Sequence, residues 1–145
     1  DALAKMLSIK SETIEERQSR SLWREIRDCI PFADGGNRPV WRVSLAPMAG
    51  HAFVADLRLH AAVDAFYDWQ GGLVWLRIDG APEAEATRAL VKKHGGGHAT
   101  LIRANEDERR AIPVFEPQPL ALASLSARVK EQFDPNGILN PGRMG

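Results

Sequence analysis

The order of patterned segments between residues 39 and 103 constrains the fold of this chain more than any other feature. Four stretches alternate in polarity or are rich in β-branched and aromatic residues, as half-buried strands are. They are residues 39–45 (PVWRVSL), 63–69 (VDAFYDW), 73–78 (LVWLRI) and 98–103 (HATLIR). Helix-like segments separate the first stretch from the second and the third from the fourth. The order β-α-β-β-α-β predicts an α+β, ferredoxin-like fold, in which a four-stranded antiparallel sheet carries two helices on one face.

The two connecting helices have signals of their own. After a break at residues 47–50, the apolar residues Phe53, Leu57 and Leu59, together with three alanines at positions 52, 55 and 61, favour a short helix. The second helix is expected over residues 83–94, and three glycines at 95–97 end it. Its apolar side should consist of Ala86, Ala89, Leu90 and Val91. Between the middle strands, Gln70-Gly71-Gly72 predicts a tight hairpin turn.

Further segments flank this core. A helix is expected from Thr13 to about Cys29, because acidic residues follow Thr13 and apolar residues then recur at roughly helical spacing. Residues 1–12 are weakly patterned and are expected to be disordered. Residues 104–119 contain three prolines and are expected to form a loop, which leads to a last helix over residues 120–133. All 145 residues are expected to form a single domain.

Composition excludes several classes of protein. The 19 lysines and arginines together balance the 19 aspartates and glutamates, so the net charge is zero. The chain therefore lacks the basic field that binding to nucleic acid or to an anionic membrane surface requires. Cys29 is the only cysteine, which rules out an internal disulfide and favours a cytoplasmic setting. No run approaches the roughly 20 apolar residues of a membrane span. The chain begins at Asp1 without a methionine.

Strand alternation assigns side chains to the two faces of the sheet. If the apolar residues lie under the helices, the opposite face carries Arg42 and Ser44 from the first strand and Leu73, Trp75 and Arg77 from the third. The fourth strand adds His98, Thr100 and Ile102 to that face, whereas the facing of residues 66–69 in the second strand is ambiguous. A surface that mixes aromatic and cationic side chains favours a docking surface or the wall of a site.

Simpler interpretations stand beside this one. Trp69 and Trp75 flank the Gly-Gly turn and are more simply read as a cross-strand aromatic pair. Exposed arginines are more often solvated than ligand-bound. His94 and His98 are four residues apart, but the intervening glycines argue against a metal site, and we predict none. The same glycines follow a helix and lack a Lys-Ser/Thr pair, so they are not a phosphate loop.

The C-terminus carries a specific pattern. Asp134-Pro135-Asn136-Gly137 is a strong turn that should stop the last helix, because a residue before proline is pushed out of the helical region. A second turn, Asn140-Pro141-Gly142, follows after two apolar residues. This FDPxxxxNPG ending resembles the C-terminal signature of FAD-linked oxidases of the vanillyl-alcohol-oxidase type. The stretches WRVS, DWQGG and GGHATLIR make the chain similar to the FAD-binding subunit of bacterial glycolate oxidase over roughly residues 20–145.

The resemblance implies that residues 1–145 are the C-terminal cap domain of a longer subunit, in which FAD is bound mainly by a domain absent from this chain. It implies a contribution to the oxidation of glycolate, or a similar 2-hydroxy acid, to glyoxylate. The expected partners are the FAD-binding domain of the same chain and other glycolate oxidase subunits, with possible association with the inner membrane through the complex. The motifs HPxxGNxH and EHG of related dehydrogenases are not in the sequence, so the chemistry could reside here or in a partner. The alternative is a ferredoxin-like regulatory or subunit-binding module without catalysis of its own.

Candidate site residues follow from the strand faces and the tail. Arg42, Arg77 or Arg103 could hold a substrate carboxylate by paired hydrogen bonds. His98 could accept the proton of the substrate hydroxyl. We therefore assign His98, Arg42 and Arg77 to catalysis. The residues assigned to cofactor binding are Trp69, Trp75, Arg103, Asn140, Gly142 and Arg143.

Overall fold

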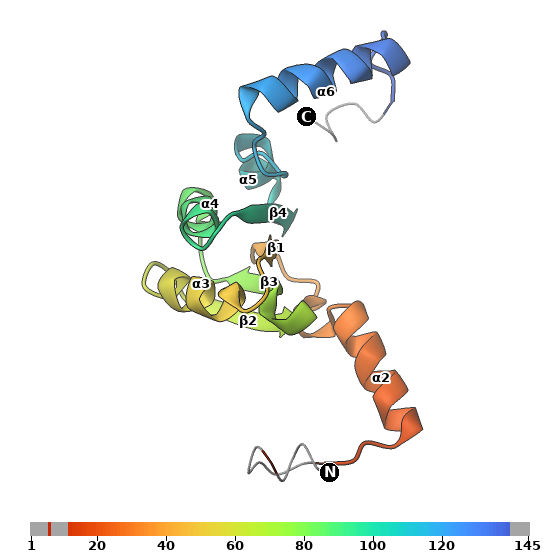
Figure 1. Ribbon diagram of the computed structural model, residues 1–145, viewed down its shortest axis with the longest axis vertical. Coiled ribbons are helices and arrows are strands. Elements are labelled where there is room, and N and C mark those ends of the chain that lie inside the picture. Colours follow the sequence, from red (N-terminus) through yellow and green to blue (C-terminus); the bar gives the residue numbers. More distant parts are fainter. Residues whose placement is uncertain (1–5, 7–11, 140–145) are drawn as a thin grey trace. The chain divides into compact units, whose positions relative to one another are not determined.

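The structure is a computed structural model that describes Met6 and residues 12–139 (Figure 1). The chain divides into two compact units, Asp1–Gly36 and Asn37–Gly145, and each is described by itself. The prediction of disorder for residues 1–12 lies, apart from Met6 and Glu12, outside the described residues. Within the described part of the chain, no helix combines the length and the apolar character needed to cross a membrane.

The first unit contains helix α2 (Glu16–Arg27) and the short 3-10 helix η1 (Ile30–Phe32). The helix predicted from Thr13 to about Cys29 is present but shorter at both ends. Glu15 has an extended backbone and precedes the first turn, and Cys29 has a left-handed φ of 50°, which an α-helix cannot accommodate. Pro31 then occupies the first turn of η1.

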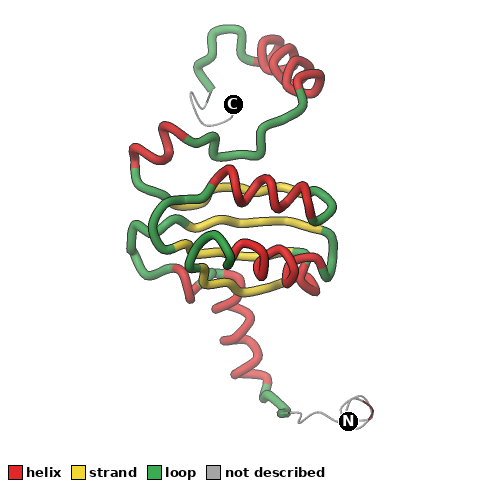
Figure 2. Tube along the Cα trace, turned by 90° about the vertical axis from the view of Figure 1, so that its left-hand side faces the viewer, coloured by secondary structure: helices red, strands yellow, loops and turns green. Residues whose placement is uncertain are grey.

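The second unit confirms the ferredoxin-like fold. Strands β1 (Val40–Leu45), β2 (Val63–Asp68), β3 (Leu73–Ile78) and β4 (Gly97–Arg103) form one antiparallel sheet in the order β2-β3-β1-β4. Helices α3 (Ala49–Leu57) and α4 (Ala84–Lys93) both lie on the same face of the sheet (Figure 2). The opposite face, which neither helix covers, is called the open face below.

The core lies between the sheet and these two helices, as the alternation predicted. Trp41, Val43, Leu76 and Leu101 are almost completely buried and pack against apolar residues of α3 and α4. Trp41 is the largest of them, and its indole N–H donates a hydrogen bond to the carbonyl oxygen of Pro82 at 2.8 Å. The single polar group of this large side chain is thus satisfied, which avoids the cost of a buried unpaired donor.

Both helices differ in detail from their predictions. Helix α3 begins at Ala49, inside the segment expected to break the chain, and ends before Leu59, which is 83% exposed. It can begin there because Gly50 is buried against the backbone of Gly71, where a Cβ atom would lie 2.3 Å from the carbonyl oxygen. In α4 the expected apolar residue Ala89 is exposed, and Thr87 is buried instead.

The segment predicted to be a loop contains one more helix, α5 (Glu106–Ala111). The sequence carried a signal for it that was missed: Asn105 and Glu108 form a capping box, in which each side chain accepts a hydrogen bond from the other residue's backbone N–H. After α5 the chain covers the outer edge of β4, where the N–H of Leu101 donates to the carbonyl oxygen of Val114. This contact protects an edge that could otherwise pair with another strand.

The last helix, α6 (Leu120–Phe133), has the predicted bounds. It ends at Asp134, whose φ of −142° and ψ of 65° lie outside the helical region, as expected for the residue before Pro135. The predicted DPNG turn is present, with the N–H of Gly137 donating to the carbonyl oxygen of Asp134 at 3.1 Å. The Asp134 carboxylate also accepts from the N–H groups of Ile138 and Leu139.

Candidate functional site

The open face of the sheet holds four of the nine predicted site residues, namely Arg42, Trp75, Arg77 and His98. The structure resolves the ambiguity of β2, because Val63 and Ala65 pack against the core and the alternate residues Asp64 and Phe66 therefore belong to the open face. Sequence reasoning missed these last two residues as members of the surface. The signal was present in the alternation of Val63 and Ala65 with Asp64 and Phe66. The open face brings together Arg42, Ser44, Asp64, Phe66, Asp68, Leu73, Trp75, Arg77, His98 and Thr100. Leu73 is almost completely buried there.

The aromatic residues of this region pair differently from the simplest prediction. Trp75 lies opposite Phe66 in the β2–β3 register, and the two rings stack with centroids 6.2 Å apart and planes 16° from parallel. Trp69 lies beyond the end of β2, in the 3-10 turn η2 (Trp69–Gly71), and lies beneath the guanidinium of Arg42. The expected cross-strand pair of Trp69 with Trp75 is therefore wrong. In this register Asp68 lies opposite Leu73, so Trp69 follows the last pair of the strands and Trp75 faces Phe66.

Arg77 is neutralised within the sheet. Its Nη2 and Nε atoms lie 2.6 Å and 3.2 Å from the same carboxylate oxygen of Asp64, its cross-strand partner. The Arg77 side chain is only 16% exposed, whereas Asp64 remains largely open to solvent. Hydrogen bonding from Arg77 holds the pKa of Asp64 below its ordinary value. Arg77 can thus serve as a fixed part of the surface, with much of its charge already matched.

Arg103 is also engaged by its own domain. Its Nε atom donates to the carbonyl oxygen of Arg38 at 3.0 Å, and Arg38 forms an ion pair with Asp79 at 2.9 Å. A register shift in the β1–β4 pairing places Arg103 opposite Val40, at the end of the strand. This position and this backbone bond fix the Arg103 side chain at the periphery of the open face.

Arg42 differs from the other two arginines. Its guanidinium carbon lies 5.4 Å from the centroid of the Trp69 ring, which is within the range of a cation–π contact. Among the residues that the structure describes, no carboxylate forms an ion pair with Arg42. On the sheet, Arg42 lies between Trp75 of β3 and Thr100 of β4. A half-buried arginine that lies on an aromatic ring and has no anionic partner is well suited to bind an anion.

The turn that carries Trp69 is held from several sides. Trp69 and Gln70 have left-handed φ values of 51° and 57°, which non-glycine residues rarely adopt. The backbone N–H of Trp69 donates to the carboxylate of Asp68 at 2.7 Å. Its carbonyl oxygen accepts from Gly72, and the carbonyl of Gln70 accepts from Met48 at the start of α3. These bonds stabilise the strained backbone and fix the position of the Trp69 ring.

His98 lies at the beginning of β4, opposite Ser44, and is exposed. It is two residues from Thr100, which is the cross-strand partner of Arg42. His98 and Arg42 are therefore diagonal neighbours on adjacent strands, a relation in which residues lie about 7–8 Å apart. The structure thus brings two of the three predicted catalytic residues to one end of the open face.

The remaining predicted residues of the tail, Asn140, Gly142 and Arg143, lie outside the described residues. Their assignment to cofactor binding stays a prediction. The preceding turn is within the described part, and the Asp134 carboxylate fixes the direction in which the chain leaves it.

Other polar clusters do not add to the site. His94 lies 2.8 Å from the carboxylate of Asp56, which also binds Lys93 at 2.8 Å, so these residues join α3 to the end of α4. Hydrogen bonds from Lys93 and then from His94 lower the pKa of Asp56. Over residues 12–139 and Met6, no three histidine, cysteine, aspartate or glutamate side chains are grouped so as to hold a metal ion.

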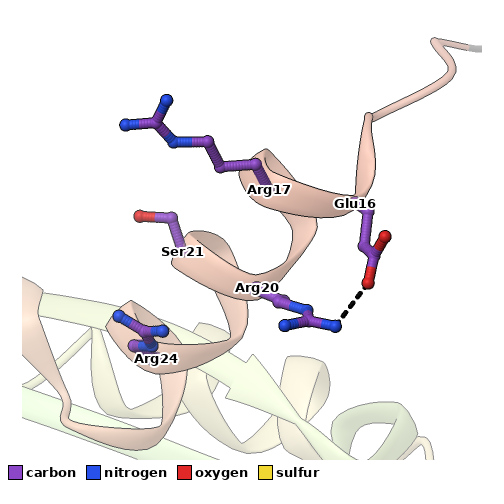
Figure 3. A pocket seen from close by; sticks show the side chains of 5 residues that line it. All are labelled: Glu16, Arg17, Arg20, Ser21 and Arg24. Atoms are coloured by element: carbon purple, nitrogen blue, oxygen red, sulfur yellow. Dashed lines mark hydrogen bonds and ion pairs between the residues drawn. The ribbon is translucent and has the colours of Figure 1, made fainter.

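A hollow in the first unit is lined by five side chains of a single helix (Figure 3). They are Glu16, Arg17, Arg20, Ser21 and Arg24. Arg20 is already paired with Glu16 one turn away. Because α2 alone provides its lining, this hollow is the side of a helix rather than an enclosed site.

Comparison with known proteins supports the resemblance seen in the sequence. The chain is similar to the glycolate oxidase subunit GlcE of Escherichia coli (strain K12), with 29% identity over 133 residues. The similar region covers 89% of this chain and 32% of that protein, so the chain spans about a third of the length of this relative. No family model matches the chain, and no solved structure matches it either.

Proposed function

We propose that this chain is the C-terminal, cap-like part of a flavin-dependent glycolate oxidase subunit and contributes to the oxidation of glycolate to glyoxylate. The observation that carries the proposal is the similarity to a glycolate oxidase subunit over 89% of the chain, including the strands that build the open face. The fold alone would not choose a function, because ferredoxin-like domains serve many.

In this proposal the open face is turned towards the FAD-binding domain of the longer subunit. Helices α3 and α4 cover the other face, so a second domain can reach the sheet here. Trp75 offers a flat aromatic surface, and Arg42, which lies over Trp69, offers a cation. This combination fits one wall of a site for a planar, electron-accepting ring, because a nearby cation stabilises the negative charge that the ring gains on reduction. FAD, when bound, would supply the acceptor for the hydride from the substrate carbon.

The chain's own residues would bind and orient the substrate. Arg42 would provide positive charge for the carboxylate of glycolate, and His98 would accept the proton of its hydroxyl group. Arg77, which is held by Asp64, would form a fixed part of the wall of the site. Held together, these groups would fix the acid with its reacting carbon facing the second domain. The other glycolate oxidase subunits are the proposed partners of the assembled protein.

The proposal is tested by single substitutions in the full-length subunit within its complex. We expect Arg42→Ala, Arg77→Ala and His98→Ala to lower glycolate turnover or flavin content, and Arg110→Ala, on the exposed surface of α5, to change neither. Lost turnover with flavin retained indicates a substrate role, and lost flavin indicates a docking role. If all three variants keep both properties, the open face is not the site. A loss of subunit assembly alone would instead favour the regulatory or subunit-binding module.

A further inference from the structure

The three arginines near the open face are not equivalent, and the difference points to one anion site. Arg77 is bonded to a carboxylate, and Arg103 is bonded to a backbone carbonyl. Among the described residues, the contact found for the Arg42 guanidinium is the face of the Trp69 ring. A cation–π contact leaves the edge of the guanidinium, where its N–H donors lie, available to a ligand.

Further donors lie next to Arg42 on the same face. Ser44 is two residues along β1, and Thr100 and His98 are the β4 partners of Arg42 and Ser44. These four side chains alternate with buried residues, so all four belong to the open face. Two hydroxyls, an imidazole and a guanidinium within one patch can each donate to an oxygen anion. None of these four side chains is a carboxylate, and the carboxylate of Asp68, on the same face at the end of β2, accepts a hydrogen bond from the backbone N–H of Trp69.

Trp69 explains how this patch keeps its geometry. The backbone of η2 is held by the Asp68 carboxylate and by hydrogen bonds to Met48 and Gly72. Gly50 and Gly72 permit the close approach of this turn to α3 and β1, since a Cβ at Gly72 would lie 3.2 Å from the carbonyl oxygen of Trp69 and 3.3 Å from that of Leu45. A turn fixed in this way provides a rigid surface beneath a long, flexible arginine side chain.

We infer that Arg42, Ser44, His98 and Thr100 form a binding site for a small monocarboxylate, in which Trp69 is a positioning residue that holds the Arg42 guanidinium in its binding orientation. The choice of glycolate as the physiological ligand rests on the proposed function, whereas the carboxylate chemistry of the site does not. Trp69 is thus assigned a role different from direct contact with a cofactor.

The site is tested on the 145-residue chain by NMR titration with glycolate, with acetate as the carboxylate without a hydroxyl and ethylene glycol as the diol without a carboxylate. We expect glycolate and acetate to shift the Arg42 Nε–H signal and the amide signals of Ser44, His98 and Thr100, and ethylene glycol to leave them unchanged. Arg42→Gln should weaken glycolate binding by about tenfold or more, as expected for the loss of hydrogen bonds to a charged group. Arg42→Lys should bind with intermediate strength because it keeps the charge and loses the planar fork.

The positioning role is tested at Trp69. Trp69→Leu should weaken glycolate binding roughly two- to fivefold, the loss of one partly exposed cation–π contact, and should increase the mobility of the Arg42 Nε–H bond in relaxation measurements. Trp69→Phe, which keeps an aromatic face, should restore most of both properties. Arg110→Gln serves as the matched control and should bind glycolate like the unmodified chain. Unchanged Arg42 mobility and affinity in Trp69→Leu would overturn the positioning role.

These results separate the site from the proposed function. Absence of any carboxylate-dependent shift at Arg42 overturns the site, whatever glycolate turnover shows in the complex. If the chain binds glycolate through Arg42 but Arg42→Gln leaves turnover in the complex unchanged, the site stands and the proposed function fails. Signal changes throughout the sheet in Arg42→Gln would indicate misfolding, and the Lys variant then decides, because unchanged affinity in that variant also contradicts the site.

Discussion

The sheet with α3 and α4 and the C-terminal helix α6 were both predicted from the sequence, yet they use their apolar residues in opposite ways. Leu76 of β3 is fully buried, whereas Leu125 of α6 is 54% exposed. The apolar residues of α6 recur at helical spacing at positions 122, 125, 129 and 133, and none of them is buried. An apolar periodicity therefore specifies a secondary structure without specifying what covers it.

The difference also indicates which helices contribute most to the stability of the folded chain. Most helices of this length gain their stability from burying one face rather than from propensity alone. Helices α3 and α4 bury residues such as Phe53 and Val91 against the sheet, so they belong to the cooperative core. Helix α6 buries none of its residues among those described, and its side-chain contacts include a hydrogen bond from Ser126 to Gln118, which precedes the helix.

The largest expected effect is the difference in stability loss between truncating a buried leucine of the sheet and an exposed leucine of α6. Leu76→Ala should reduce the free energy of unfolding by about 2–5 kcal/mol, because it removes buried methyl groups and leaves a cavity. The same change at an exposed position, Leu125→Ala, should alter it by less than about 0.5 kcal/mol. Urea unfolding followed by circular dichroism measures both. Equal losses in the two variants would show that α6 is buried in the folded protein.

An intermediate effect tests the close approach between α3 and η2. Gly50→Ala should destabilise the second unit by about 1–3 kcal/mol, because the added methyl group meets the Gly71 carbonyl oxygen and the Val74 side chain at 2.3 Å and 2.7 Å. Gly36→Ala is the matched control, since its Cβ would meet only the flexible side chain of Asp34, at 3.3 Å. Thermal unfolding of both variants gives the comparison. A Gly50→Ala protein as stable as the control would mean that the turn carrying Trp69 is not held by α3.

The smallest effect concerns pH and separates ion pairs between elements from those within one helix. The lowered pKa of Asp56 means that its contribution to stability is present above the ordinary aspartate pKa of about 3.9 and is lost as the pH falls through the lowered folded-state value. Asp56→Asn should therefore reduce stability at pH 7, and the difference from the unmodified chain should shrink towards pH 3.

Glu16→Gln is the control for this prediction, because the pair of Glu16 with Arg20 is local to α2 and both side chains are more than 70% exposed. It should change the urea midpoint little at either pH, since exposed pairs are screened by solvent. A constant difference between Asp56→Asn and the unmodified chain from pH 7 to pH 3 would exclude the proposed link between the Asp56 carboxylate and stability.

Much of the candidate surface could be predicted because alternation along a strand is a local property. The outward positions of Arg42, Trp75 and His98 follow from the burial of their immediate neighbours. The facing of β2 was left ambiguous because Phe66 and Tyr67 are both large and aromatic, although the alternation of Val63 and Ala65 with Asp64 and Phe66 carried the signal. The packing of Val63 and Ala65 on the core places Phe66 on the open face. Helix α5 was missed for another reason: its residues are charged, and its start is marked by a capping box rather than by apolar periodicity.

The sequence by itself determined the order of the strands and helices, the stop of α6 at Asp134, and the face on which most strand residues lie, because turn chemistry and side-chain periodicity act over a few neighbouring residues. Only the tertiary structure decided that Arg77 of the open face is paired with a carboxylate and that Arg42 lies on an aromatic ring. The β2–β3 register places Asp64 opposite Arg77, and the left-handed turn at Trp69 carries its ring beneath Arg42. Both outcomes depend on strand register and on the packing of η2 against α3, which join residues distant in the chain, so no local pattern could have specified them.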